Sequence, residues 1–271
     1  MTPLEAETSA VDLTGASVPL AARSVRDRPA GSIVDFVESL LVTILLALFG
    51  TTFVVQAFKI PSESMEPTLL VGDHLLVNKF VFEGTGAWYE RVLPYRSIRR
   101  SDIIVFKFPF DDHPHYVKRV IGLPGDRIRI VANQVYVNGA RLSEPYVVHD
   151  SSGDPAVDNF PPTDRGVMQV GLRPEWASEM MRYVQRGELV VPSRHYFAMG
   201  DNRDRSWDSR YWGFVDRTAI MGRPIVIYWS VEATSEDYGD RSVSGSIRGI
   251  EETLAHLLTR TRWHRMLREV H

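Results

Sequence analysis

Residues 116–131 read YVKRVIGLPGDRIRIV, and this stretch decides the fold class of the chain. Two short runs rich in β-branched residues, 116–121 and 127–131, lie on either side of the sequence GLPGD. Polar and apolar residues alternate within the second run, which is the pattern of a strand with one buried face. The stretch therefore predicts two short β-strands.

Runs of the same kind recur along most of the chain. They lie at residues 74–82, 102–108, 134–137, 195–199 and 225–230. The run that ends at Val137 leads into Asn138-Gly139, which is a type I′ hairpin signal. Short strands at this spacing predict a mostly β fold, in which an antiparallel sheet or barrel-like domain occupies residues 59–246.

One stretch interrupts the strand pattern. Residues 149–192 are rich in Asp, Pro and Gly, and a helix-like piece lies around residues 175–185. We predict a smaller and less ordered region inserted into the β domain, and the sequence assigns it no role.

An uncharged run precedes the β-rich part. Its twenty residues, 39–58, carry no charge, and Glu38 and Lys59 close its two ends. As a helix the run would be about 30 Å long, which matches the hydrocarbon thickness of a bilayer. Buried helices of soluble proteins are rarely so apolar over this length, and a cleaved signal peptide has a shorter apolar core. The sequence therefore predicts one transmembrane helix over residues 34–58.

The charges on either side of the uncharged run indicate its orientation. Arg23, Arg26 and Arg28 precede it, whereas Lys59 is the one Lys or Arg in the twenty positions that follow. Lys and Arg concentrate on the cytoplasmic side of a membrane span. We therefore expect residues 1–33 to be a flexible cytoplasmic tail and the β domain to lie outside the cytoplasm, anchored to the cell membrane.

The last part of the chain is basic. In residues 247–271 apolar side chains recur at helical spacing, and five arginines lie among them. This pattern predicts a basic amphipathic helix. It would either lie on an anionic membrane surface or pack against the β domain, and the sequence leaves both possibilities open.

The composition excludes several classes of protein. The chain has 271 residues and a formal net charge of −3, from 31 Lys and Arg against 34 Asp and Glu. This balance excludes a strongly basic nucleic-acid coat, and we expect no nucleic-acid partner. Cysteine is absent, which excludes disulfides, thiolate metal sites and a cysteine nucleophile.

Three segments carry residues suited to catalysis. They read PSESMEPTL at residues 61–69, YVKRVIGLPGD at 116–126 and MGDNRDRSWDSRYWG at 199–213. A serine hydroxyl is a weak nucleophile until a base removes its proton. Lys118 lies in an apolar run, and burial lowers the pKa of a lysine so that its neutral amine can act as that base. Ser64 and Lys118 are therefore a chemically reasonable nucleophile and base.

Each segment taken alone has an ordinary structural explanation. A single lysine in a strand most often faces solvent, serines after a helix most often form a turn, and residues 201–204 would be a polar turn. Taken together, the segments resemble type I signal peptidases, the membrane-bound Ser–Lys endopeptidases that remove signal peptides from exported proteins. The resemblance covers the uncharged run and most of residues 58–228, apart from the insertion.

The resemblance implies a role for each matching position. Ser64 would be the nucleophile and Lys118 its general base, and Ser206 would hydrogen-bond to the lysine amine and orient it. The Ser62 hydroxyl and the Ser64 backbone N–H would form the oxyanion hole, which stabilises the tetrahedral intermediate.

Supporting ion pairs and a substrate pocket follow from the same resemblance. Asp201 with Arg119, and Asp208 with Arg210, would brace the site. The positions that match pockets for small side chains at −1 and −3 of the substrate are Phe58, Ile60, Leu69, Tyr116 and Val117. The implied substrates are preproteins with signal peptides of the Ala-x-Ala type, bound extended beside a strand edge. Neither a metal nor a cofactor is implied.

One position departs from the family pattern. Glu63 separates the two serines, where many relatives have Gly or another small residue. A carboxylate here would add negative charge beside a developing oxyanion. We therefore expect the Glu63 side chain to point away from the site.

Three other hypotheses fit the sequence less well. A self-cleaving repressor-type Ser–Lys protease would need a DNA-binding helix-turn-helix in place of the uncharged run. A membrane-anchored β domain that only binds or scaffolds would have no chemical need for Ser64, Lys118 and Ser206 together. A metalloenzyme built on residues 111–115 lacks a distant ligand cluster. The sequence does not indicate which preproteins are cleaved or the oligomeric state.

Overall fold

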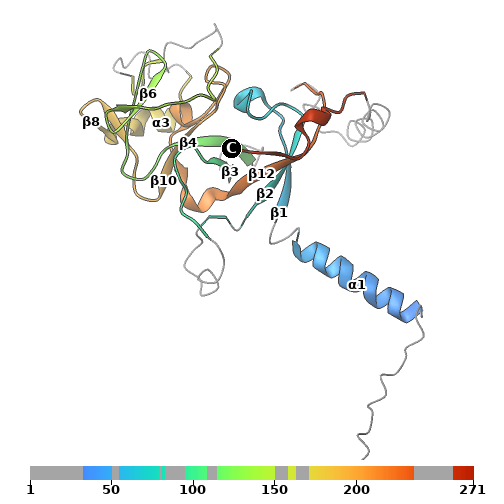
Figure 1. Cartoon of the computed structure of the whole chain (residues 1–271). Coiled ribbons are helices and arrows are strands. Elements are labelled where there is room, and N and C mark those ends of the chain that lie inside the picture. Colours follow the sequence, from blue (N-terminus) through green and yellow to red (C-terminus); the bar gives the residue numbers. More distant parts are fainter. Residues whose placement is uncertain are drawn as a thin grey trace, which may run out of the picture. The chain divides into compact units, whose positions relative to one another are not determined.

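The structure is a computed structural model. It describes residues 33–50, 55–79, 81–82, 95–108, 115–149, 158–162, 171–234 and 259–271. The chain forms two compact units, residues 1–45 and 46–271. Antiparallel β-strands dominate the second unit, as the sequence predicts (Figure 1).

The N-terminal helix is shorter than the sequence predicts. Helix α1 (Ile33–Phe49) has no buried side chain. The last part of the predicted helix is instead strand β1 (Val55–Lys59), all of which pairs antiparallel with β2 (Asp73–Asn78). The prediction was wrong there because an apolar run by itself does not distinguish a strand from a helix. Among the described residues, no helix combines the length and apolarity needed to cross a bilayer.

The larger sheet forms the centre of the second unit. Its strands follow the order β1-β2-β12-β3-β4-β10-β11, and β13 pairs with β12. The remaining strands are β3 (Ile103–Lys107), β4 (His115–Gly122), β10 (His195–Met199), β11 (Val215–Asp216), β12 (Ile220–Ser230) and β13 (Arg268–Glu269). Residues 220–222 of β12 pair with β3 and residues 223–230 pair with β2, so β12 joins the two halves of the sheet.

The smaller sheet includes part of the region predicted as a less ordered insertion, whose residues 150–157 and 163–170 lie outside the described residues. Its order is β7-β6-β5-β9-β8, with β5 (Arg127–Val131), β6 (Gln134–Val137), β7 (Ala140–Arg141), β8 (Val184–Gln185) and β9 (Glu188–Val190). Two of these strands come from the region predicted as an insertion, and β9 pairs with β5.

The helix-like piece of this region is also shorter than predicted. It consists of α3 (Pro174–Glu179) and one 3-10 turn, η5 (Met180–Arg182). Trp176, Met180 and Leu189 are buried in one apolar cluster with side chains of β5 and β6. This packing holds the described part of the region against the smaller sheet (Figure 1).

The C-terminal segment contains a strand where the sequence predicts a helix. Residues 247–258 lie outside the described residues, and the rest consists of one 3-10 turn, η8 (Trp263–Arg265), followed by β13. Leu267, between the two, has a φ of 60°, which a right-handed helix does not allow. The cause is tertiary, because β13 takes up the backbone hydrogen bonds of residues 226–227 at the edge of β12. The described part of the segment therefore packs against the β domain.

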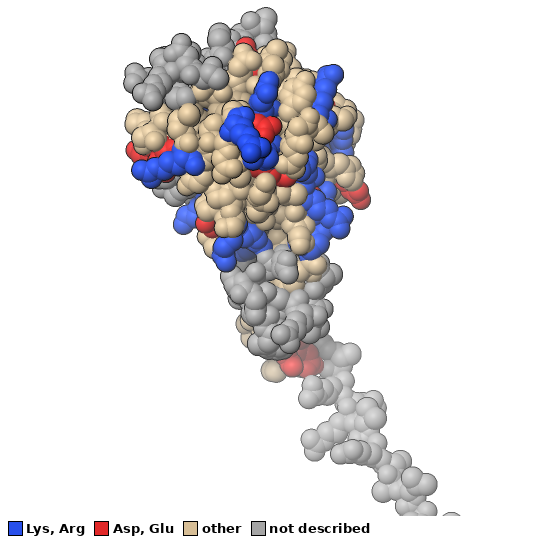
Figure 2. Space-filling view, turned by 90° about the vertical axis from the view of Figure 1, so that its left-hand side faces the viewer, with Lys and Arg blue, Asp and Glu red and all other residues tan. Residues whose placement is uncertain are grey.

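On the face that Figure 2 shows, basic and acidic side chains of the described residues do not form separate patches. Figure 2 shows Lys and Arg side chains of the described residues scattered among uncharged and acidic ones. The described part of this face therefore has no continuous basic surface.

Gly72, in the turn before β2, makes a close backbone contact that can be tested. Its φ is 91°, and an added Cβ would lie 2.1 Å from the backbone oxygen of Val231. We expect Gly72→Ala to lower the free energy of unfolding by about 3 kcal/mol or more, because overpacking adds to left-handed strain. Urea unfolding followed by tryptophan fluorescence measures this loss.

Gly139→Ala is the matched control. Gly139 has a φ of 79°, but nothing lies within 4 Å of its added Cβ. Only the backbone strain of about 1–2 kcal/mol should remain in this variant. Equal losses in the two variants would contradict the importance of the contact with Val231.

Candidate active site

Ser64 and Lys118 meet in a buried site. Ser64 lies in a 3-10 turn, η2 (Glu63–Met65), and Lys118 lies in β4, between β3 and β10. The Lys118 Nζ donates a hydrogen bond to the Ser64 Oγ over 2.6 Å. Ser64 is 6% exposed and Lys118 is 3% exposed, so both reactive atoms are shielded from bulk water. The structure thus brings together the two residues that the sequence predicts as nucleophile and base.

Burial lowers the pKa of Lys118 from 10.5 to about 8. Loss of hydration is the largest cause, because it disfavours the charged ammonium. The charges of Asp208 and Asp201 oppose this shift, and the charge of Arg210 adds to it. At pH 8 about half of the lysine is neutral, against well under a hundredth for an ordinary lysine. A neutral amine has a free lone pair, so it can accept the proton of the Ser64 hydroxyl.

Two buried ion pairs flank the lysine. Arg119 donates to both oxygens of Asp201, with Nε–Oδ1 at 2.8 Å and Nη2–Oδ2 at 2.7 Å. Arg210 donates to both oxygens of Asp208 in the same way, over 2.9 Å each. These are the pairs that the resemblance implies. Two parallel hydrogen bonds fix the orientation of each partner as well as its position.

Asp208 keeps its charge although it is completely buried. Burial alone would raise the pKa of its carboxyl group, but the charge and hydrogen bonds of Arg210 hold that pKa below its ordinary value. The backbone N–H of Gly200 donates a further hydrogen bond to Oδ2, over 3.0 Å. The carboxylate therefore links the loop at Gly200 to α4 (Ser209–Trp212), whose first turn it caps.

Ser206 lies near the nucleophile but does not make the predicted hydrogen bond to Lys118. It is 4% exposed, and within the described part of the chain its Oγ has no hydrogen-bond partner. An added Cβ on Gly200 would lie 2.3 Å from this Oγ and 2.3 Å from the Ser64 backbone oxygen. Gly200 therefore lets the two serine segments approach each other. Hydrogen bonds in catalytic sites are often incomplete without substrate, and the buried hydroxyl is left free.

Two further residues hold the site, and the sequence analysis assigned a role to neither of them. The Thr68 Oγ1 donates a hydrogen bond to Asp201 Oδ2 over 2.6 Å, which links the segment after the nucleophile to the ion pair. The backbone N–H of Asn202 donates to the Ser64 backbone oxygen over 3.2 Å. Both residues lie inside the quoted motifs, but their roles depend on partners more than 130 positions away along the chain.

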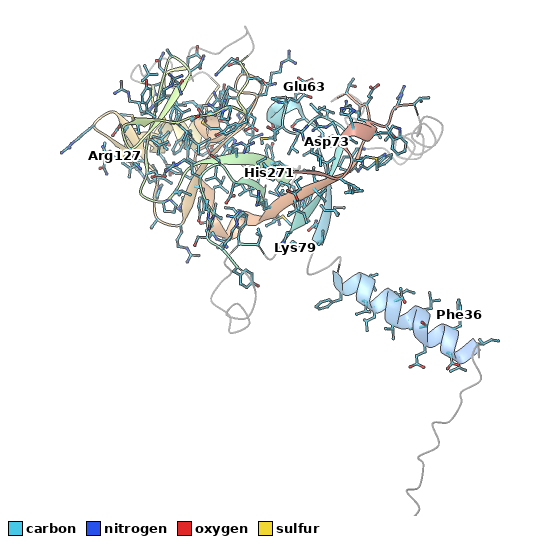
Figure 3. The ribbon with its side chains drawn as sticks, in the orientation of Figure 1. Phe36, Glu63, Asp73, Lys79, Arg127 and His271 are labelled. Carbon is cyan, nitrogen blue, oxygen red and sulfur yellow. The ribbon has the colours of Figure 1, made fainter. Side chains whose placement is uncertain are left out.

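The turn that carries Ser64 also presents Ser62 and Glu63. The Ser62 and Ser64 Oγ atoms lie 3.4 Å apart, within hydrogen-bond distance. The Glu63 carboxylate forms an ion pair with Arg205 at 2.5 Å, and its side chain is 37% exposed. Figure 3 marks the position of Glu63. The carboxylate is thus turned toward solvent and a cation, as expected from its position between the serines.

Four of the five predicted pocket residues share one apolar cluster. Ile60 and Leu69 are buried in it, and the half-buried Phe58 and Val117 pack against it. Tyr116 packs instead against a neighbouring cluster, although its ring centre lies 5.7 Å from the Lys118 Nζ. Because Ile60 and Leu69 are at most 3% exposed, Phe58 and Val117 supply the surface that remains open.

The structure describes only part of residues 111–115, on which the less favoured metalloenzyme hypothesis rests. His115, at the start of β4, lies among the described residues, whereas residues 111–114 lie outside them. In the part of the chain that the structure describes, no group of three or more His, Cys, Asp or Glu side chains is placed to hold a metal ion.

Known proteins are similar in sequence to most of this chain. The family model described as "Signal peptidase, peptidase S26" matches residues 33–229. Signal peptidase I of Pseudomonas fluorescens is 34% identical over 212 residues, which are 73% of this chain and 73% of that protein. Signal peptidase I of Aquifex aeolicus is 32% identical over 232 residues, or 73% of this chain and 85% of that protein.

A solved structure was also matched. It is a signal peptidase I from Enterococcus faecalis V583, 30% identical, and the match covers 47% of this chain and 97% of that chain. Its TM-score is 0.31. The family match over residues 33–229 includes all three motifs that meet at Ser64 and Lys118. From its residues 33–229 this chain belongs to the signal peptidase family, peptidase S26.

Proposed function

We propose that this protein removes signal peptides from exported preproteins with Ser64 as nucleophile and Lys118 as general base. Family membership gives the class of reaction, which is that of a serine endopeptidase. The observation that supports the choice of residues is the 2.6 Å hydrogen bond between their buried side chains. The lowered pKa of Lys118 supports its role as a base, because a lysine with an ordinary pKa would stay protonated at neutral pH.

The reaction proceeds through an ester on Ser64. The neutral Lys118 amine takes the hydroxyl proton while Oγ attacks the carbonyl carbon of the scissile bond. The resulting ammonium gives this proton to the leaving amine, which frees the mature protein and leaves the signal peptide as an ester. Lys118 then takes a proton from an attacking water molecule and returns it to Oγ, which releases the signal peptide.

Ser62 and Ser206 assist the pair in this proposal. The Ser62 hydroxyl and the Ser64 backbone N–H donate to the oxyanion of the tetrahedral intermediate. The free buried hydroxyl of Ser206 is available to the Lys118 amine when that amine gives up its contact with Ser64. The ion pairs Arg119–Asp201 and Arg210–Asp208 hold the surrounding segments in place.

The pocket favours small side chains. Ile60 and Leu69 are buried, so a substrate side chain cannot enter the space that they occupy. Phe58 and Val117 are half-buried and offer a shallow apolar surface for the substrate. A methyl group can occupy such a surface, whereas a longer side chain would clash with it. We therefore infer cleavage after Ala-x-Ala-type sequences, with the substrate extended along a strand edge.

The N-terminal part serves as the membrane anchor in this proposal. The large apolar side chains of α1 are 44–82% exposed, which is costly in water and favourable in lipid. The arginines at 23, 26 and 28 place the N-terminus in the cytoplasm and the β domain outside it. The active site would then lie on the side where signal peptides emerge.

Removal of either member of the pair should abolish cleavage. In Ser64→Ala no nucleophile remains, and in Lys118→Met no base remains, so we expect kcat to fall about 10⁴-fold or more. The test is cleavage of a preprotein by the detergent-solubilised full chain, with the cut site mapped by mass spectrometry. Lys107→Met is the matched control, because this lysine lies on the neighbouring strand and is exposed. Continued cutting by both variants would show that other residues do the chemistry.

The rate should rise with pH through about 8. Lys118 is a base only without its proton, and its pKa is about 8. Below that pH kcat/KM should fall about tenfold per pH unit, and above it the rate should level off. The measurement is kcat/KM for a fluorogenic Ala-x-Ala peptide in buffers containing EDTA. An acid optimum, or loss of activity in EDTA, would contradict the mechanism.

Loss of the Ser62 hydroxyl should slow the chemical step. Removal of one oxyanion-hole donor typically lowers kcat about 10²–10³-fold. We expect this effect for Ser62→Ala with little change in KM, because the donor acts on the transition state. Ser62→Thr keeps the hydroxyl and should retain most of the activity. A Ser62→Ala enzyme with the kcat of the unchanged protein would remove Ser62 from the oxyanion hole.

A further inference from the structure

We infer that Arg265, in the C-terminal segment, is a positioning residue of the catalytic site. This inference rests on the proposed function. Arg265 lies beyond the family match, which ends at residue 229, and outside the three motifs. Arg265 is nevertheless only 4% exposed, and arginine side chains are rarely buried to this extent in proteins.

Arg265 forms a buried fork with Asp73. Its Nη2 lies 2.6 Å from Asp73 Oδ2, and its Nε lies 3.2 Å from Oδ1. Asp73 is completely buried and lies beside the C-terminal segment (Figure 3). The same carboxylate accepts from the Leu70 backbone N–H over 2.8 Å and from the Ser230 Oγ over 2.6 Å. Arg265 therefore neutralises the charge that organises the turn before β2.

The second contact of Arg265 reaches toward the nucleophile. Its Nη2 donates to the backbone oxygen of Thr68 over 3.0 Å. The side chain of the same threonine donates to Asp201, the partner of Arg119. Arg265 thus holds the backbone of a residue whose hydroxyl supports the ion pair next to Lys118.

The rest of the C-terminal segment fixes Arg265 in this place. β13 pairs with β12, and the Val270 backbone N–H donates to the Ile225 backbone oxygen over 3.1 Å. The Val270 side chain is 3% exposed in the apolar cluster that includes Ile60 and Leu69. The backbone oxygen of His271 accepts from both terminal nitrogens of Arg119, over 3.2 Å each.

The contacts of Arg265 and Asp73 hold the segment of residues 65–70, which follows Ser64. The backbone N–H of Leu69 donates to the Met65 backbone oxygen over 2.9 Å, so the segment is a compact turn. Arg265 holds that turn at Thr68 and, through Asp73, at its far end. Loss of the guanidinium should let the turn shift against Lys118, which would lengthen the hydrogen bond between Ser64 and its base.

The test separates position from stability. Arg265→Met alone would leave the Asp73 carboxylate buried and unpaired, which is strongly destabilising. The double variant Arg265→Met with Asp73→Asn removes that charge and keeps an acceptor oxygen. Arg268→Met is the matched control, because Arg268 lies in the same segment with its side chain exposed.

The readout is the single-turnover rate constant for cleavage of an Ala-x-Ala peptide by excess full-length enzyme. This constant does not depend on the folded fraction as long as active enzyme exceeds the peptide and is saturating, which is checked by doubling the enzyme concentration. We expect it to fall about tenfold or more in the double variant, as when a distant change misplaces reacting groups. It should stay within about twofold for Arg268→Met, as for most surface changes. The urea midpoint of each variant is measured in parallel.

A folded double variant with the rate constant of the unchanged protein would overturn the inference. If the double variant does not fold, Arg265→Lys decides, because it keeps the charge but loses the fork. A slower rate at an unchanged urea midpoint supports positioning, and an unchanged rate overturns it. Failure of the proposed function is distinguishable, because then the unchanged protein would not cleave the peptide either.

Discussion

The burial of Lys118 beside Ser64 is the interaction on which the rest of the structure depends. An ammonium inside a protein is costly unless it is paired, and the alternative is that the group gives up its proton. Here the lysine lies on a strand inside the larger sheet, and its partner is a neutral hydroxyl. Its pKa falls to about 8 for that reason. In the proposed mechanism, Lys118 then acts as the base for the Ser64 hydroxyl, to which it is hydrogen-bonded.

The buried charges around this pair are arranged so that each is neutralised locally. Arg119 with Asp201, Arg210 with Asp208, and Arg265 with Asp73 each form two hydrogen bonds within a pair. Such pairs contribute little net stability, because desolvation offsets much of the attraction. Their value is geometric, since a fork of two bonds sets the orientation of the segments it joins. Two of the pairs join a strand of the larger sheet to a segment outside it: Arg119 in β4 holds Asp201 in a loop, and Asp73 in β2 holds Arg265 in a 3-10 turn. The third pair, Arg210 with Asp208, lies at the start of α4.

Several strands and the pair Ser64 and Lys118 were predictable, because the patterns that indicate them lie within short stretches of the sequence. The runs at 102–108, 116–121, 127–131 and 195–199 form β3, β4, β5 and β10, since β-branched and aromatic residues are concentrated within each run. Ser64 and Lys118 stood out because their motifs combine residues with a chemical reason to occur together. The family resemblance of these motifs implied the ion pairs of Arg119 and Arg210, which the structure contains.

The sequence by itself therefore determined the β-rich class and the placement of several strands, and it predicted the pair Ser64 and Lys118 that the structure brings into contact. Tertiary structure decided which apolar runs pair with which. Val55–Lys59 forms a strand because it pairs with β2. Residues 268–269 form a strand because they pair with residues 226–227 of β12. The tertiary structure also brings Arg265 to Asp73 and leaves the Ser206 hydroxyl without a hydrogen-bond partner among the described residues. These outcomes depend on partners far away along the chain, and short-range periodicity carries no information about such partners.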